Sequence, residues 1–283
     1  MINLGNVKIV TDSTIDMKQD YIDKYGITVV PLSITIDNQT FTDGIDIKPD
    51  EFLRLMKNSE ELPKSSQPST GKFLEVYDEL GKNGDSVISI HMTSGMSGTV
   101  QSAEGASQMT KTDVSVVDSM FISKALGFQV LEAAKMAQQG FDKETILNRI
   151  EEIRKNTNLY IMVDTLENLA KGGRIGKGKA LIGSLLNVKP IASLQGGVYT
   201  PVGKVRSHAQ GVKYLAKQFA EDIKGKTVKA VGIAHADAFE LASKLKHAIQ
   251  DTTPHCQIDI SFTTPVISTH TGPGAIGFMF FAE

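Results

Sequence analysis

Apolar and polar residues follow two regular patterns in the first 160 residues of the chain. Short runs rich in Val and Ile predict buried strands, which we place at 7–11, 28–36, 87–90, 114–117 and 159–163. Between them, apolar residues recur every three or four positions, which predicts helices at 15–25, 49–57, 71–81, 99–109, 125–138 and 142–155. Because strands and helices alternate, we expect a mainly parallel sheet with helices on both faces.

The pattern changes after about residue 160. Strands at 188–194 and 198–202 flank Gly196-Gly197, which is typical of a hairpin turn. The other expected elements are helices at 166–171, 180–186, 209–223 and 238–249, and strands at 228–234, 257–261 and 276–280. We therefore predict two α/β domains: residues 1–160 with the mainly parallel sheet, and residues 161–283 as a smaller, mixed α/β domain.

Two turns rich in hydroxyl groups, 12–14 and 93–99, follow predicted strands. In a parallel sheet, ligands bind beyond the carboxyl ends of the strands. The second turn reads Thr-Ser-Gly-Met-Ser-Gly-Thr and leads into a predicted helix. Its backbone amides and the positive end of the helix dipole suit an anion, so the sequence predicts a carboxylate or phosphate site here. Turn 12–14 lacks the second Asp of an aspartyl-phosphate motif and is interpreted as a cap.

Composition narrows the classes of protein. The 283 residues carry a net charge of −2 and no Trp, and only 6% are aromatic, so we expect no nucleic-acid partner. Cys256 is the single cysteine and the His residues are scattered, which excludes a disulfide framework and gives no metal-ligand spacing. Because no signal pattern or apolar run of about 18 residues occurs, we expect a cytoplasmic protein with at most transient membrane contact.

Residues 173–180 nearly match the phosphate-binding loop G-x-x-x-x-G-K-[ST]. Ala180 takes the place of the magnesium-binding hydroxyl, and the preceding segment has a helical pattern where this loop needs a strand. The alternatives are a glycine turn that ends a helix, or a turn from which the planar guanidinium of Arg174 contacts an anion.

Residues 95–99 occupy the place of a nucleophile elbow but lack its final Gly. Ser97 can therefore be a nucleophile paired with a His, a helix N-cap, or a hydrogen-bond donor to a carboxylate. His270 lies in a second polar segment, 263–274, whose Gly-Pro-Gly end allows close approach of a ligand. From the sequence alone this segment is either part of a site or a surface turn.

Seven short motifs occur in the chain in a characteristic order. They are VTDST (10–14), VVPL (29–32), SSQPS (65–69), TSGMSGT (93–99), VDS (117–119), KGGRI (171–175) and STHTGPGA (268–275). Together they resemble the motifs of the DegV family, in family order, over nearly the whole chain. The resemblance implies two α/β domains that hold a long-chain fatty acid in the cleft between them.

The family includes the fatty-acid-binding subunit of bacterial fatty acid kinase (FakB). That subunit presents the acyl carboxylate to a separate ATP-binding kinase subunit, which makes an acyl phosphate for phospholipid synthesis. By this resemblance, the chain is a lipid-binding carrier with the fatty acid as its ligand. It would have no cofactor and no complete catalytic site of its own.

The resemblance also implies site residues. Positions that match or adjoin the family's carboxylate-binding residues are Ser65, Ser66, Ser97, Gly98, His270 and Thr271. Arg174 matches an arginine that the family needs for phosphoryl transfer with the kinase. The family often has Thr at the place of Ser65, and Ser keeps the hydroxyl while it loses a methyl group.

Other parts of the site and two alternative functions remain open. The acyl tail is expected to contact the segment 180–186 and the strand residues Phe278, Met279 and Phe280. The lysines beside Arg174 are candidates for docking the kinase: Lys171, Lys177 and Lys179. The alternatives are an acyl hydrolase that uses Ser97 and His270, and a nucleotide-binding enzyme that uses residues 173–180.

Overall fold

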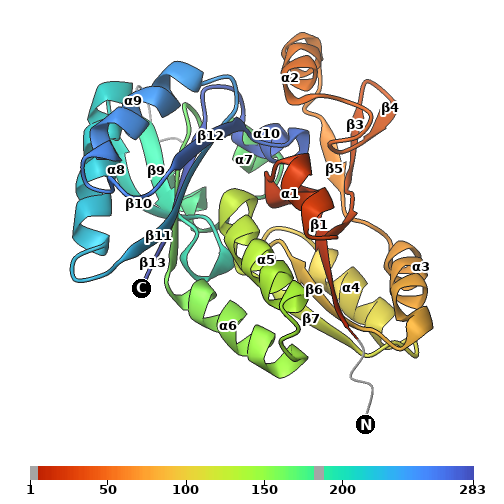
Figure 1. Cartoon of the computed structure of the whole chain (residues 1–283). Coiled ribbons are helices and arrows are strands. Elements are labelled where there is room, and N and C mark those ends of the chain that lie inside the picture. The colour runs from red at the N-terminus through yellow and green to blue at the C-terminus, as the bar shows by residue number, and fades with distance from the viewer. Residues whose placement is uncertain (1–5, 182–187) are drawn as a thin grey trace.

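The computed structural model describes residues 6–181 and 188–283 (Figure 1). The strands of these residues form separate sheets. The first sheet has the strand order β2-β1-β6-β7, and all of its pairings are parallel. Its strands are β1 (Val7–Asp12), β2 (Thr28–Val30), β6 (Ser86–His91) and β7 (Val114–Asp118). The carboxyl ends of β1 and β6 therefore lie side by side, and the turns 12–14 and 93–99 leave the sheet at the same edge.

Helices cover both faces of this sheet, as the sequence predicts. They are α3 (Thr70–Leu80), α4 (Thr99–Ser107), α5 (Ser123–Gln138) and α6 (Lys143–Lys155). Successive strand residues point to opposite faces. Val10 and Val87 accordingly pack in the cluster with α3 and α4, whereas Ile9 and Ile88 pack in the cluster with α5 and α6.

The second sheet is mixed, with the order β10-β9-β8-β13-β11-β12. Its strands are β8 (Thr157–Met162), β9 (Lys189–Ser193), β10 (Thr200–Val205), β11 (Val228–His235), β12 (Ile258–Phe262) and β13 (Ile276–Ala282). Only the β11–β12 pairing is parallel. Two helices, α8 (His208–Asp222) and α9 (Phe239–Gln250), pack on one face. These observations confirm the predicted α/β class with a parallel first sheet and a mixed second sheet.

Helix α5 joins the two units of the molecule, which are the first sheet with its helices and the second sheet with its helices. It contacts β1 and β6 of the first sheet and β8, β11 and β13 of the second, so it lies between the sheets (Figure 1). The largest hydrophobic cluster runs through this contact, because Ile88, Leu126 and Met279 belong to one set of packed residues. The two units therefore share one hydrophobic core.

A small antiparallel sheet with the order β4-β3-β5 projects from the first unit. Its strands are β3 (Ser33–Ile36), β4 (Gln39–Thr42) and β5 (Lys64–Ser66). The remaining α-helices of the described residues are α1 (Gln19–Lys24), α2 (Pro49–Asn58), α7 (Glu167–Lys171) and α10 (Pro265–Thr271). Helix α10 contacts α2, α7, β3 and β5, which brings residues 265–271 against this sheet.

Four local predictions are wrong. The expected strand 28–36 is divided at Pro31 into β2 and β3, which belong to different sheets. The expected helix 15–25 begins only at Gln19, after a 3-10 turn at Ser13–Ile15. No strand or helix is predicted from the sequence for residues 62–70 or for the polar segment 263–274, but the first contains strand β5 and the second contains helix α10. In each case contacts with distant segments override the local pattern.

Two further predictions cannot be decided. Most of the expected helix 180–186 lies outside the described residues, and the part that is described belongs to a 3-10 helix, Gly176–Leu181. The proposed domain boundary at residue 160 falls inside β8, a strand of the second sheet, and stays a prediction. Within residues 6–181 and 188–283, no helix combines the length and apolar character needed to cross a membrane.

Candidate functional site

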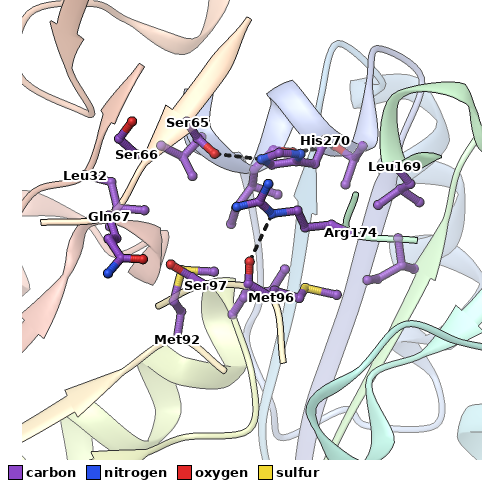
Figure 2. Close-up of a pocket in the computed structure, with 15 residues that line it drawn as sticks. Leu32, Ser65, Ser66, Gln67, Met92, Met96, Ser97, Leu169, Arg174 and His270 are labelled. Carbon is purple, nitrogen blue, oxygen red and sulfur yellow. Dashed lines mark hydrogen bonds between the residues drawn. The ribbon is translucent and has the colours of Figure 1, made fainter. Parts of the chain in front are cut away.

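A cavity of about 320 Å³ opens where α10 and α7 meet the turn 93–99 and β5 (Figure 2). Its polar lining residues are Ser65, Ser66, Gln67, Ser97, Arg174, His270 and Thr271. Its apolar lining residues are Leu32, Met92, Met96, Ile122, Ile161, Leu169, Val266 and Ile267. The site thus combines residues from both halves of the chain.

A second, smaller cavity of about 30 Å³ adjoins the apolar part of the first. The two cavities share Ile122, Ile161, Ile267 and Thr271 as lining residues. The second cavity continues toward Met279 and lacks the polar residues Ser65, Ser97 and Arg174. The combined space is therefore polar at one end and apolar at the other.

Strand β13 shows which predicted tail residues face this space. Met279 lines the smaller cavity and packs in the core that both units share. Phe278 and Phe280 point to the opposite face, where they pack against Phe219 of α8. The prediction for Phe278 and Phe280 is therefore wrong, because side chains alternate along a strand.

His270 and Ser65 form the contact that joins α10 to β5. The imidazole Nε2 of His270 lies 2.8 Å from the hydroxyl Oγ of Ser65 (Figure 2). Burial, together with the nearby positive charge of Arg174, lowers the pKa of His270 to about 4. The ring is therefore neutral at pH 7. Its Nδ1 is buried and makes no hydrogen bond with any part of the chain that the structure describes.

Ser97 lies opposite this pair, on the turn that precedes α4. Its Oγ is 2.9 Å from Oγ1 of Thr99 and accepts a hydrogen bond from the Thr99 amide at 3.3 Å. Gly98, not Ser97, is the N-cap of α4. Since His270 bonds to Ser65, the Ser97–His270 pair that an acyl hydrolase would need is not formed among the described residues.

Gln67 is a lining residue that the sequence reading did not select. Its amide nitrogen donates to the carbonyl oxygen of Gly98 at 3.0 Å and to Oγ of Ser102 at 2.8 Å. A side chain at Gly98 would collide with Gln67. Gln67 therefore fixes the start of α4, and its place inside the motif SSQPS was the signal available in the sequence.

Arg174 is placed by the turn that ends α7. The amide of Arg174 donates to the carbonyl of Leu169, and the amide of Gly173 donates to that of Ala170, with Gly173 at φ +75°. This is a Schellman motif, in which glycine takes the left-handed conformation after the helix. Because a helix precedes Gly173, residues 173–180 lack the strand that a nucleotide-binding loop requires.

The guanidinium of Arg174 bridges the two sides of the cavity. Its Nε donates to the carbonyl oxygen of Met96 at 3.0 Å (Figure 2), and its Nη1 donates to that of Gly172 at 2.7 Å. A side chain at Gly172 would collide with the ring of His270. Arg174, the turn 93–99 and His270 are therefore packed as one group.

The predicted site residues mostly meet in this cavity. Those that line it are Ser65, Ser66, Ser97, Arg174, His270 and Thr271. Gly98 is not a lining residue, although it caps α4 beside them. The hydroxyl of Thr271 donates to the carbonyl of Ile267 at 3.1 Å within α10, so its hydrogen is already used.

A buried series of hydrogen bonds among Ser89, His91 and Asp12 supports the turn 93–99. Asp12 accepts from the amide of Met92 at 2.8 Å and lies 3.2 Å from Nδ1 of His91. Nε2 of His91 lies 2.7 Å from Oγ of Ser89. Burial alone would raise the pKa of Asp12, but the contact with His91 lowers it below the ordinary value. The order Ser-His-Asp matches a hydrolase triad, yet all three side chains are buried, so they hold the turn.

Comparisons with known proteins agree with the architecture. The family model described as "Uncharacterised protein, DegV family" matches residues 6–283. A DegV domain-containing protein of Staphylococcus aureus (strain N315) is 41% identical over 271 residues, which cover 96% of this chain and 97% of that protein.

Two solved structures are also similar. A DegV family protein from Thermus thermophilus, described with fatty acid binding, has a TM-score of 0.93 and 31% identity and covers 98% of this chain and 100% of its own. DegV from Bacillus subtilis, described as a fatty acid binding protein, has a TM-score of 0.90 and 36% identity, with coverage of 98% and 99%.

Proposed function

Since the chain belongs to the DegV family, we propose that it binds a long-chain fatty acid in the cavity between its two units. The observation that carries this proposal is the polarity of the cavity, with hydroxyls, a His and an Arg at one end and mainly apolar side chains at the other. The ligand class is supported by the similar structures from Thermus thermophilus and Bacillus subtilis, which are described as fatty acid binding.

The carboxylate would lie among Ser65, Ser97 and His270. A buried carboxylate needs several donors or a nearby positive charge, because its loss of water is otherwise unfavourable. The two hydroxyls and the imidazole can donate, and the guanidinium of Arg174 is close enough to lower the pKa of His270. Ser66, Gly98 and Thr271 would shape the backbone and the walls around the carboxylate.

The acyl tail would run from this polar end past Ile122, Ile161 and Ile267 toward Met279. Each methylene group removed from water contributes about 0.8 kcal/mol. Most of the affinity would therefore come from the tail, while the polar end fixes which end of the ligand faces Arg174 and the turn 93–99.

We further propose that the chain presents this carboxylate to a separate ATP-dependent kinase subunit, which forms an acyl phosphate. Arg174, half-buried at the polar end, would contact the transferred phosphoryl group through its planar guanidinium. Lys171, Lys177 and Lys179 are exposed beside it and are the proposed docking residues. In this proposal the chain is a carrier, without a cofactor or a complete catalytic site of its own.

Mass spectrometry of organic extracts from the purified chain tests the ligand class. We expect a long-chain fatty acid in wild-type extracts and a reduced amount in Ser97→Ala, since a hydrogen bond to a charged group is worth about 1.5–3 kcal/mol. Ser94→Ala is the matched control, because Ser94 belongs to the same turn but is exposed and does not line the cavity. Wild-type extracts without fatty acid, after expression in cells that contain it, would overturn the proposal.

A further inference from the structure

We propose that Asp43 and Asp16 are positioning residues, which hold the first amides of α10 and so fix His270 at the polar end of the cavity. This inference rests on the proposed function only for the statement that His270 contacts the ligand. The two carboxylates lie more than 200 positions before α10 in the chain and come from the first unit.

Helix α10 does not cap its own N-terminus. Its N-cap residue, Thr264, makes no side-chain cap bond, and the Thr264 hydroxyl is buried without a partner among the described residues. Pro265 follows and has no N–H group. The next amide, that of Val266, needs an acceptor from elsewhere, because the first amides of a helix have no partner inside the helix.

Asp43 supplies that acceptor. Its Oδ1 accepts from the amide of Val266 at 3.2 Å, and its Oδ2 accepts from the hydroxyl of Ser13 at 2.6 Å. The same Ser13 oxygen accepts from the amide of Leu32 at 3.1 Å. Leu32 and Val266 both line the cavity, so Asp43 ties two of its walls together. Asp43 itself is only 1% exposed.

Asp16 holds the N-cap residue of α10, Thr264, which lies two positions before Val266. Its Oδ1 accepts from the amide of Thr264 at 2.8 Å, and its Oδ2 accepts from the hydroxyls of Thr263, at 2.7 Å, and Ser123. Asp16 and Ser123 adopt left-handed backbone conformations, with φ of +41° and +60°. These conformations are unfavourable for residues other than glycine and persist where surrounding contacts impose them.

Because α10 is short, the hydrogen bonds at its start also determine the position of His270. The helix has seven residues, too few to be stable by itself, so its position depends on its contacts. Val266 and His270 are four positions apart and lie on the same face, and both line the cavity. Fixing the amide of Val266 therefore fixes the ring that bonds to Ser65.

Asp43 lies in an environment that is unfavourable for its charged form. Burial, together with the negative charges of Asp16 and Asp12, raises its pKa to about 7. Lys124 is the cation that faces Asp16, and it also pairs with Asp259 at 2.6 Å. An asparagine would avoid the buried charge and still present an oxygen to Val266 and an N–H to Ser13.

The test follows the protonation of His270 by NMR in a pH titration of the ligand-free protein, which includes about pH 5.5, where an exposed imidazole is mostly charged. We expect His270 to be neutral in the wild type and in Asp43→Asn. In Asp43→Ala the helix loses its acceptor and the ring gains water, so we expect the pKa of His270 to rise by about one unit or more. The control is Asp50→Ala, an exposed carboxylate on α2.

A His270 pKa in Asp43→Ala within about 0.3 units of the wild-type value would overturn the proposal. If Asp43→Ala does not fold, Ser13→Ala decides in its place, because it removes the hydroxyl that orients Asp43. A rise of the His270 pKa in Ser13→Ala then supports the proposal, and an unchanged pKa overturns it.

A double-mutant cycle separates positioning from general destabilisation. With palmitic acid as the probe, we expect Asp43→Ala to lower affinity about tenfold in the wild type and to have little further effect in His270→Ala. Equal losses in both backgrounds would overturn the role of His270 as the target. If palmitic acid does not bind the wild type, the proposed function fails, while the NMR result still decides the positioning of His270.

Discussion

At the residue scale, the structure gives His270 and Asp43 ionisation states that differ from those of exposed side chains. Burial keeps His270 neutral at pH 7 by lowering its pKa to about 4. The neutral ring can donate to a carboxylate from one nitrogen while the other carries a lone pair. Burial has the opposite effect on Asp43, whose pKa rises to about 7. The largest cause of both shifts is the same, because removal from water disfavours the charged form of either group.

Asp43→Asn should change how stability depends on pH. The ordinary pKa of 3.8 rises to about 7 in the folded protein, so between these values the folded state binds a proton that the unfolded state has lost. The contribution of Asp43 to wild-type stability therefore falls as pH rises from about 4 to about 7, and Asp43→Asn lacks this loss. Urea unfolding at about pH 5 and about pH 8 should show a relative gain for the variant at pH 8 of up to roughly 2.5 kcal/mol.

Changes in hydrogen bonding caused by Asp43→Asn act at both pH values, so the difference between the two measurements isolates the ionisation of this carboxyl. Asp16 and Asp12, whose negative charges contribute to the raised pKa of Asp43, remain in both proteins. An identical pH dependence for wild type and variant would contradict the raised pKa.

At the element scale, the short helices α7 and α10 form the wall that presents Arg174 and His270. Neither helix is long enough to be stable alone, so each depends on its ends. Helix α7 ends in a glycine turn that places Arg174, and α10 begins against carboxylates of the first unit. The close contact between Gly172 and the His270 ring sets the spacing of the two helices.

Gly172→Ala should therefore disturb the site without changing the backbone preference, because Gly172 has an ordinary negative φ of −75°. The added methyl group would displace His270, and overpacking of this kind is unfavourable by about 1–3 kcal/mol. We expect weaker palmitic acid binding and a lower Tm. Gly71→Ala is the control, since the nearest atom to its added carbon is 3.9 Å away. Unchanged binding in Gly172→Ala would show that the helix spacing is not critical.

At the scale of the whole molecule, the site exists because two units share one core across α5. Arg174 of the second half donates to Met96 of the first, and His270 bonds to Ser65 across 205 positions of sequence. This arrangement places the polar end of the cavity between the units, with Arg174 among its lining residues.

The variant Arg174→Ala tests the proposal that the chain presents its ligand to a kinase subunit. Most of the affinity would come from the acyl tail, so we expect palmitic acid binding to change by less than about threefold. Acyl phosphate formation with the kinase should be abolished, because the guanidinium would contact the phosphoryl group. Arg54→Ala, an exposed arginine on α2, should affect neither measurement. A collapse of lipid binding in Arg174→Ala would assign this residue to ligand binding instead.

The sequence by itself determined the features that depend on neighbouring residues. Helical and strand periods placed most elements within a few residues, and the hydroxyls and glycines of the turn 93–99 predicted an anion site there, which stays a prediction. These signals are local, because the repeat of a helix or strand and the chemistry of a turn are read within about ten positions. The family motifs added which distant residues belong to one site.

Only the tertiary structure decided which groups meet. It separated β2 from β3 at Pro31, turned Met279 toward the cavity and Phe278 away from it, and bonded His270 to Ser65, whereas the acyl hydrolase alternative required a pair of His270 with Ser97. It also brought Asp43 to the start of α10, a contact with no trace in local spacing. The physical reason is that such contacts depend on how whole elements pack, and burial then sets the charge state of the groups they enclose.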